Sequence, residues 1–288
     1  MQKKIGLIGL GAMGRGAALN LLKKGFQVVG YDVRAESLEW LKSNGGIPAD
    51  TLTELASQVK TVLSFVINSS QTESVLYGDN GLVGKLPADS IFIASSTMDP
   101  AYVEDLGQRL AKDSIRLIDS PVTGGPEGAL NGTLTIMGSG DPAAFDEVKP
   151  LLDAMGARLY YLGSAGAGSK LKVVNQMLVG ANLVAAAEAM ALARRLGLPL
   201  ATTHEALSSG AASSWMLANR GKKMISESFD EVTAAVDILL KDLSLVLDAT
   251  RDVKFAAPIA HVAYLKFLES SAQGLGLKDI SVVTKSYS

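Results

Sequence analysis

The segment from Ser164 to Gly197 constrains the fold most, because it predicts one long, mostly apolar helix between two differently patterned parts of the chain. Good helix formers dominate it, no proline interrupts it, and Ser164 or Ser169 can cap its start. Since apolar residues lie on nearly all of its sides, the helix needs packing partners before and after it in sequence. A membrane span is the alternative, but the uncharged run at 173–187 is too short for a bilayer and contains amide side chains.

The composition is that of a globular chain with room for two domains, since 288 residues with 48% apolar side chains can bury ample cores. The 27 basic and 29 acidic residues leave no positive excess, so we expect neither a nucleic-acid nor a membrane partner. Without cysteine, and with two histidines, the chain offers no thiolate or histidine-rich site, so we expect no metal. The strand-like start at Lys3 shows no secretory signal, which predicts a cytoplasmic location.

The first 32 residues combine an apolar run, a glycine turn and a helical segment. Ile5 to Ile8 predicts a strand, a helix follows from Arg15 to Lys24, and Asp32 ends the next strand. Such glycines allow a tight turn, close approach of a pyrophosphate and close helix packing, and the acid accepts a hydrogen bond from a ribose hydroxyl. A purely structural turn is the alternative, but the complete context favours a dinucleotide site. The cofactor contacts predicted here are Gly9, Gly11, Ala12, Met13, Gly14 and Asp32.

Strands and helices continue to alternate, which predicts a parallel, doubly wound sheet of the Rossmann type. Ligands of such sheets lie outside the carboxyl ends of the strands. Asn68 and Thr97, which follow the apolar runs at 62–67 and 91–94, should therefore face the cofactor. The alternative for each is a helix cap, most clearly for Thr97 just before Asp99.

A glycine- and proline-rich stretch from Ser120 to Gly132 predicts a loop before a strand at 133–137. Its backbone N–H groups in a stiff frame suit a carboxylate ligand, and composition alone does not separate this function from a hairpin-like connection without a ligand. From residue 201 onward no strong strand pattern recurs. We therefore predict an α/β domain at 1–163 that binds a dinucleotide, and an all-helical domain at 164–288 that begins with the long interdomain helix.

Lys172 is the best candidate for proton transfer beside a dinucleotide. It shares a helix face with Asn175 and Gln176, which can orient a substrate or hold the lysine amine. Burial on an apolar helix disfavours the charged lysine, which makes it a usable acid or base. The alternative is a solvated surface lysine at a helix start. His204 and His261 have the surroundings of ordinary structural residues.

Three motifs together resemble those of the β-hydroxyacid dehydrogenase, or 3-hydroxyisobutyrate dehydrogenase-like, family. They are the glycine turn at Gly9–Gly14, Asp119-Ser120-Pro121-Val122-Thr123-Gly124-Gly125, and Gly166-x-Gly168-x-x-x-Lys172-x-x-Asn175-Gln176, with Leu240-Lys241-Asp242-Leu243 as a fourth. The resemblance spans the chain. Within the family, the residues around Trp215 and Asp237 look most similar to the L-threonate dehydrogenase branch.

The resemblance implies a role for each matching residue. Lys172 matches the catalytic lysine, and Asn175 or Gln176 matches an amide that contacts substrate. Thr123, Gly124 and Gly125 match the loop that binds the substrate carboxylate, and Thr97 and Lys241 match cofactor contacts. At Val66, Ile67 and Asn68, also predicted to contact the cofactor, the chain departs from the commoner Leu-Pro pair. The family further implies a homodimer or homotetramer.

These features predict an oxidoreductase that transfers a hydride between a nicotinamide cofactor and a small hydroxy acid, preferably a four-carbon sugar acid such as L-threonate. Asp32 favours NAD by repelling a 2′-phosphate, whereas Arg34 can make NADP acceptable. The enzymatic alternatives are a reductase of short semialdehyde acids, such as tartronate semialdehyde, and a 3-hydroxyisobutyrate dehydrogenase. The alternative outside enzymology is a catalytically silent dinucleotide-binding scaffold.

Overall fold

A computed structural model describes residues 4–287, and its contacts divide the chain into two compact units, Met1–Lys172 and Val173–Ser288. The division falls inside the long helix α8 (Ala167–Arg195). The proposed domain limit between residues 163 and 164 lies in the loop before that helix. Residues 1–3 and 288, which the predicted N-terminal strand and the proposed domains include, lie outside the described residues.

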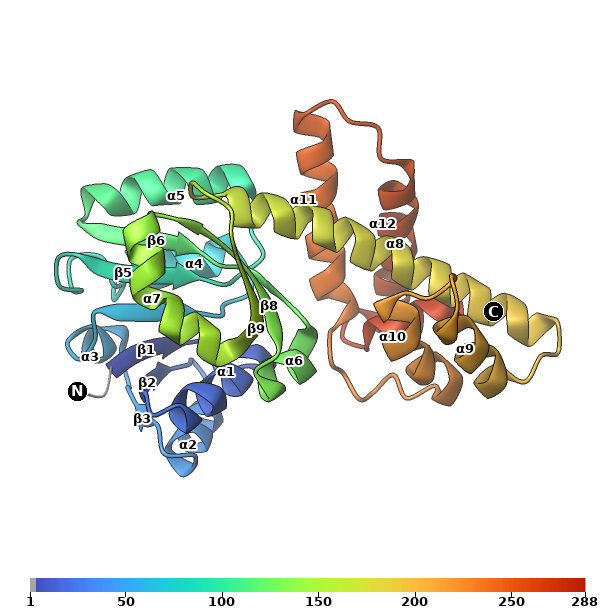
Figure 1. The fold of residues 1–288 in the computed structure, drawn as a ribbon, viewed down its shortest axis with the longest axis horizontal. Coiled ribbons are helices and arrows are strands. Elements are labelled where there is room, and N and C mark those ends of the chain that lie inside the picture. The colour runs from blue at the N-terminus through green and yellow to red at the C-terminus, as the bar shows by residue number, and fades with distance from the viewer. Residues whose placement is uncertain (1–3, 288) are drawn as a thin grey trace. The chain divides into compact units, whose positions relative to one another are not determined.

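The first unit alternates strands and helices, drawn from blue to yellow-green in Figure 1. Its elements are β1 (Lys4–Ile8), α1 (Ala12–Lys23), β2 (Gln27–Tyr31), α2 (Ala35–Ser43), β3 (Ile47–Pro48), α3 (Leu52–Ala56), β4 (Thr61–Ser64), α4 (Ser69–Tyr77), β5 (Ser90–Ala94), α5 (Pro100–Lys112), β6 (Ile115–Asp119), β7 (Val122–Thr123), α6 (Gly125–Asn131), β8 (Leu134–Gly140), α7 (Pro142–Met155) and β9 (Gly156–Tyr161). The sequence pattern did not predict β3, α4, β7 and α6.

The sheet runs in the order β3-β2-β1-β4-β5-β6-β8-β7, and β9 pairs with β8. Strands β1 to β6 are mutually parallel where they pair, as the alternation with helices predicts. Strand β8 runs antiparallel to both β6 and β7. The fold is therefore of the Rossmann type with a mixed sheet, because the chain turns back through β7 and α6 after β6, and β9 then pairs parallel with β8.

Two hydrophobic clusters cover the two faces of this sheet, which is the arrangement of a doubly wound fold. On one face, residues of α1, α6 and α7 such as Leu21, Ala129 and Leu152 are buried. On the other, residues of α3, α4 and α5 such as Leu55 and Leu106 are buried. The sheet edge at the carboxyl ends of the parallel strands is thus left to the loops that carry most of the predicted site.

The regular secondary structure in the described part of the second unit is helical, apart from an isolated bridge between Ala235 and Asp279. After α8 come α9 (Leu200–Ser209), α10 (Trp215–Ser226), α11 (Val236–Asp252), α12 (Pro258–Ser270) and two short turns of helix, η1 (Ser271–Leu275) and η2 (Ile280–Tyr287). This confirms the predicted all-helical part of the chain.

Within residues 4–287, α8 is the one helix long and apolar enough to cross a membrane. Leu183, Ala187 and Met190 of this helix belong to the core of the second unit, so α8 is a core helix. Val174 and Leu178 on the same helix remain about half exposed in the single chain. The sequence predicts that α8 is buried on nearly all sides, but in the single chain one face of the helix stays exposed.

Candidate active site

The glycine turn between β1 and α1 has the shape that a dinucleotide pyrophosphate needs. Gly9 has a φ of 87°, which favours glycine, and its N–H donates to the Tyr31 carbonyl at 3.0 Å. A Cβ on Gly14 would lie 1.8 Å from the Gly9 carbonyl oxygen, so only glycine allows this packing. A Cβ on Gly11 would meet nothing within 4 Å, so open space adjoins the start of α1.

That open space adjoins the N-terminal end of α1, at the first backbone N–H groups of the helix. Gly11 is the N-cap residue and supplies no side chain to those donors, so Ala12 and Met13 start the helix without a capping side chain. A helix start combines free donors with the positive end of the helix dipole and therefore attracts a phosphate. The turn thus fits the pyrophosphate of a dinucleotide.

Asp32 follows β2 and lies beside this turn. Its carboxylate accepts hydrogen bonds from the Leu10 N–H at 2.7 Å and from the backbone and guanidinium of Arg34 at 3.0–3.2 Å. Burial works to raise the pKa of Asp32, but the hydrogen bonds from Arg34 and Leu10 outweigh it and hold that pKa below its usual value. Asp32 is therefore a charged acceptor at the position where the motif requires one.

The predicted contacts after β4 and β5 lie at the carboxyl ends of those strands. Asn68 is the N-cap of α4, because its side-chain oxygen accepts the Gln71 N–H. The cap of α5 is Asp99, so Thr97 is not its cap. Val66 accepts a hydrogen bond from Ser96 at 2.6 Å, and the Ile67 side chain is about half exposed. The capping alternative thus applies to Asn68, while the cofactor contacts of these residues stay predictions.

The predicted loop at 120–132 is wrong in its details, since it holds the short strand β7 and the helix α6. Thr123 pairs with Thr135 across β7 and β8. Gly124 and Gly125 have φ values of 125° and 64°, which reverse the chain at the start of α6. Neither hydrophobic periodicity nor helix and strand propensity predicts such short elements, because the turn between β7 and α6 depends on two consecutive glycines with positive φ.

Lys172 is buried, which contradicts the alternative of a solvated surface lysine. Its side chain is 7% exposed, and Nζ donates to the Val122 carbonyl at 2.8 Å. This contact holds the amine next to β7 and hence beside Thr123 and the Gly124 turn. The fold therefore brings together two predicted site segments that lie about 50 residues apart.

Asp119, the first residue of the motif at Asp119–Gly125, anchors the start of α8. It is fully buried at the end of β6, and its carboxylate accepts hydrogen bonds from the N–H and the hydroxyl of Ser169, both at 2.8 Å, and from the Ser139 hydroxyl at 3.0 Å. Ser139 in turn accepts the Gly168 N–H at 2.9 Å. The start of α8 is thus anchored from a distant strand, and Ser169, one of the two predicted caps, lies inside the helix and bonds to Asp119.

Burial raises the pKa of Asp119 to about 6, although the hydrogen bonds from Ser169 and Ser139 oppose that rise. A Cβ on Gly168 would lie 2.2 Å from the Met137 carbonyl oxygen, so glycine is needed for this close approach. The sequence signal for the anchor was an acid at the end of a buried strand, followed later by a glycine-led helix start. Lys172 lies one helical turn beyond that anchor.

In the second unit, the buried side chain of Gln176 donates to Asp242 of α11 at 2.6 Å. Lys241 forms an ion pair with the same carboxylate at 2.7 Å. Asn175 is partly buried. Asp242 therefore joins two predicted site residues, Gln176 of α8 and Lys241 of α11.

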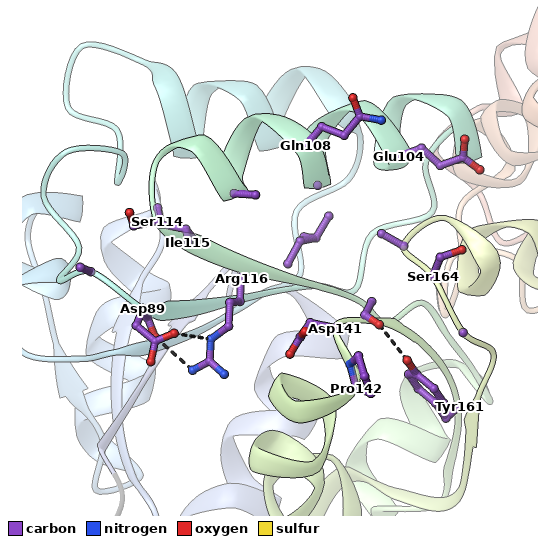
Figure 2. Close-up of a pocket in the computed structure, with 17 residues that line it drawn as sticks. Asp89, Glu104, Gln108, Ser114, Ile115, Arg116, Asp141, Pro142, Tyr161 and Ser164 are labelled. Carbon is purple, nitrogen blue, oxygen red and sulfur yellow. Dashed lines mark hydrogen bonds and ion pairs between the residues drawn. The ribbon is translucent and has the colours of Figure 1, made fainter.

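A groove of about 1140 Å³ in the first unit lies between α5, β6 and the start of α7 (Figure 2). Arg116 in this groove is already paired with Asp89 at 2.8 Å and Glu147 at 2.9 Å. The Tyr161 hydroxyl donates to the Gly140 carbonyl. None of the predicted site residues lines this groove, so its size does not mark the cofactor site.

The two histidines have structural contacts. His204 lies 2.9 Å from the Leu217 carbonyl oxygen, and His261 lies 2.9 Å from that of Ala257. Among residues 4–287 no group of three or more acidic or histidine side chains is placed to hold a metal ion.

Comparison with known proteins places this geometry in a family. The model of the NAD-binding domain of 6-phosphogluconate dehydrogenase matches residues 4–163, and that of the NAD-binding region of NADP-dependent 3-hydroxyisobutyrate dehydrogenase matches residues 166–287. L-threonate dehydrogenase of Cupriavidus necator is 41% identical over 99% of this chain and 96% of its own. The chain belongs to the 3-hydroxyisobutyrate dehydrogenase-like family. It is accordingly an NAD(P)-dependent hydroxy-acid dehydrogenase.

Two solved structures have a similar fold. A 3-hydroxyisobutyrate dehydrogenase from Salmonella typhimurium has a TM-score of 0.94 and 35% identity, with 99% of this chain and 100% of that chain covered. A structure of Psf3 in complex with NADP+ and 2-OPP has a TM-score of 0.92 and 25% identity, with 99% and 100% covered. The first is named for 3-hydroxyisobutyrate and not for threonate, so family membership alone does not identify the substrate.

Proposed function

We propose that the chain oxidises a small hydroxy acid with NAD, that a four-carbon sugar acid such as L-threonate is its substrate, and that Lys172 is the general acid/base. The observation that carries the proposal is the buried Nζ of Lys172, held at the Val122 carbonyl next to Thr123. The full-length similarity to an L-threonate dehydrogenase supports the choice of acid.

In this proposal Gly9, Gly11, Gly14 and the start of α1 bind the pyrophosphate, and Asp32 binds the adenosine ribose. The other proposed cofactor contacts are Ala12, Met13, Val66, Ile67, Asn68, Thr97 and Lys241. When bound, the nicotinamide supplies the hydride acceptor. The proposed substrate contacts are Thr123, Gly124, Gly125, Asn175 and Gln176.

Lys172 handles the proton that accompanies hydride transfer. In the oxidative direction its neutral amine accepts the hydroxyl proton while the carbon loses hydride, and in the reductive direction its ammonium donates that proton to the developing alkoxide. The hydrogen bond to the Val122 carbonyl orients the amine toward β7. The Thr123 hydroxyl and the N–H groups near Gly125 are suited to a substrate carboxylate.

The test is Lys172→Ala, assayed with L-threonate and NAD. We expect kcat to fall by about 10²- to 10⁴-fold, the usual contribution of a general acid/base, while the dissociation constant of NAD changes little. Lys170→Ala is the matched control, because Lys170 lies on the same helix but is exposed and paired with Glu104. Parental turnover in Lys172→Ala would dismiss the assigned role.

A panel of C3 to C5 hydroxy acids and semialdehydes, assayed with NAD and NADP, tests the substrate. The second candidate, a 3-hydroxyisobutyrate dehydrogenase, is favoured by the 35% identity to the Salmonella protein of that name. A reductase of short semialdehydes such as tartronate semialdehyde would show its highest kcat/KM in the reductive direction. Tight NAD binding without turnover of any acid would favour the silent scaffold.

We also propose that the chain assembles as a homodimer or homotetramer. Apolar side chains of the second unit are exposed in the single chain on both α8 and α12, and Leu178, Leu192, Ile259, Val262 and Leu265 are each more than half exposed. Apolar patches of this kind mark association surfaces. Sedimentation equilibrium of the purified protein gives the assembly size, and a monomer would contradict this proposal.

A further inference from the structure

The carboxylate of Asp119 has no part in the proposed chemistry, although the segment that leads to Thr123 begins beside it. Asp119 is fully buried, and burial raises its pKa to about 6. Taking a carboxylate out of water costs free energy, whereas an ordinary side-chain cap could satisfy the start of α8 without that cost. The buried acid therefore needs an explanation beyond the stability of the helix.

The hydrogen bonds of this carboxylate converge on the first turn of α8. Oδ1 accepts the Ser169 hydroxyl and Oδ2 accepts the Ser169 N–H, both at 2.8 Å. Oδ2 also accepts the Ser139 hydroxyl at 3.0 Å, and the Ser139 oxygen accepts the Gly168 N–H at 2.9 Å. Two consecutive residues of the helix are thus bonded to one carboxylate, either directly or through one serine.

Two glycines let the helix come close enough for these bonds. Gly166 has a φ of 89°, and a Cβ there would lie 3.0 Å from the Pro100 carbonyl oxygen. A Cβ on Gly168 would lie 2.2 Å from the Met137 carbonyl oxygen and 3.1 Å from Asp119 Oδ2. The backbone at the start of α8 therefore packs directly against β6 and β8, with no side chain between them.

The same part of the chain holds α8 a second time, one helical turn later. Lys172 lies three residues after Ser169, so the two side chains project from one face of the helix. Lys172 Nζ donates to the carbonyl of Val122, which lies three residues after Asp119. Two contacts therefore join the two segments, and together they hold the amine beside Thr123.

We propose that Asp119 is a positioning residue for proton transfer, which holds the first turn of α8 so that the Lys172 amine stays within reach of a substrate hydroxyl. Asp119 acts through Ser169 and Lys172 and exchanges no proton with the substrate. General acid/base catalysis needs the two groups within hydrogen-bond reach, and a displacement of about 1 Å can cost about 10²-fold in rate. This inference rests on the proposed role of Lys172.

The experiment compares the steady-state kinetics of Ser169→Ala and the native protein, with NAD and the hydroxy acid of highest kcat/KM in the panel above. Ser169→Ala removes the hydroxyl bond to Asp119 and keeps the N–H bond, so the chain should still fold. We expect kcat to fall by about 10- to 100-fold, while KM for the acid changes by less than about twofold. The dissociation constant of NAD should stay the same.

Ser90→Ala is the matched control. Ser90 is also fully buried, and its hydroxyl donates to the Pro87 carbonyl at the amino end of β5, opposite the proposed site. This variant loses one buried hydrogen bond of the same kind, so its stability should fall by a similar amount while kcat keeps its native value.

Ser169→Ala combined with Lys172→Ala separates positioning from a general loss of structure. A residue that acts through the amine adds nothing once the amine is gone, so the residual rate of Lys172→Ala should fall by less than about twofold. Equal fold losses in the two backgrounds would overturn the inference. Native kcat in Ser169→Ala, with activity lost in Lys172→Ala, would overturn the positioning role alone, whereas native turnover in Lys172→Ala would overturn the proposed function as well.

Discussion

Two carboxylates at the ends of parallel strands, Asp32 after β2 and Asp119 in β6, have the same local pattern and opposite electrostatics. Each accepts a backbone N–H from a glycine-led segment, Leu10 in one case and Ser169 in the other. The pKa of Asp32 is lowered because donors that include the cation Arg34 outweigh its burial, whereas burial raises the pKa of Asp119 to about 6. The two pKa values differ because Asp32 has the neighbouring cation Arg34, whereas Asp119 is fully buried and bonded to the hydroxyls and N–H group that anchor α8.

The largest expected effect is on stability, from removal of the buried anchor. Asp119→Ala leaves the N–H and hydroxyl of Ser169 and the Ser139 hydroxyl without their acceptor. We expect a loss of about 3 to 5 kcal/mol in the free energy of unfolding, measured by urea denaturation. Asp141→Ala, which removes the side-chain cap of α7, is the control and should cost about 1 kcal/mol. Equal losses would mean that the burial of Asp119 adds nothing to an ordinary cap.

The pH dependence of stability should separate the two acids by sign. The folded-state pKa of Asp119, about 6, is above the unfolded value of about 3.9, so the native state binds the extra proton in this interval. The free energy of unfolding contributed by Asp119 therefore falls as pH rises from about 4 to 6, by up to about 3 kcal/mol, and is level above that. Asp32, with its lowered pKa, contributes stability that is lost as pH falls through its folded-state pKa.

Asp119→Asn measures this directly. The free energy of unfolding of the native protein minus that of this variant should fall as the pH rises from about 4 to 6 and stay level up to pH 7. Asp32→Asn should show no such trend over the same interval. If this difference in the free energy of unfolding does not change with pH, the pKa of Asp119 is the same in the folded and unfolded states. The predicted contrast between Asp119 and Asp32 would then be wrong.

The smallest effects come from glycines beside the two acids. Gly168→Ala places a Cβ against the Met137 carbonyl and should cost about 1 to 3 kcal/mol in the free energy of unfolding.

Gly11→Ala places its Cβ in open space at an ordinary φ of −72°, so the free energy of unfolding should change by less than about 0.5 kcal/mol. The same variant should weaken NAD by about tenfold or more, because the methyl group occupies the space for the pyrophosphate. Urea denaturation measures the stability of Gly168→Ala and Gly11→Ala, and calorimetric titration measures their affinity for NAD. Parental NAD affinity in Gly11→Ala would contradict the proposed cofactor site.

Much of the fold could be predicted because its signals lie in consecutive residues. Apolar runs predicted β1, β2, β4, β5 and β8, and the long apolar pattern at 164–197 predicted α8. The short elements β7 and α6 could not be predicted, since the two positive φ values at Gly124 and Gly125 make the turn and only pairing with β8 makes the strand.

The candidate site was predictable residue by residue but not in its contacts. Lys172, Thr123 and Asp32 were identified from motifs. Three hydrogen bonds join residues at least 50 positions apart: Lys172 to Val122, Ser169 to Asp119 and Gln176 to Asp242. Local pattern carries no information about such pairs, because packing of distant elements creates them.

The sequence by itself therefore determined the order of strands and helices, the glycine turn for a dinucleotide and the lysine helix, since backbone propensity and glycine spacing are local properties. Only the tertiary structure decided which polar side chains are buried and what they bind. A buried polar group has no water to bind and must therefore form its hydrogen bonds within the fold. For this reason Asp119 bonds to the start of α8, Lys172 to the Val122 carbonyl, and Asp32 to Leu10 and Arg34.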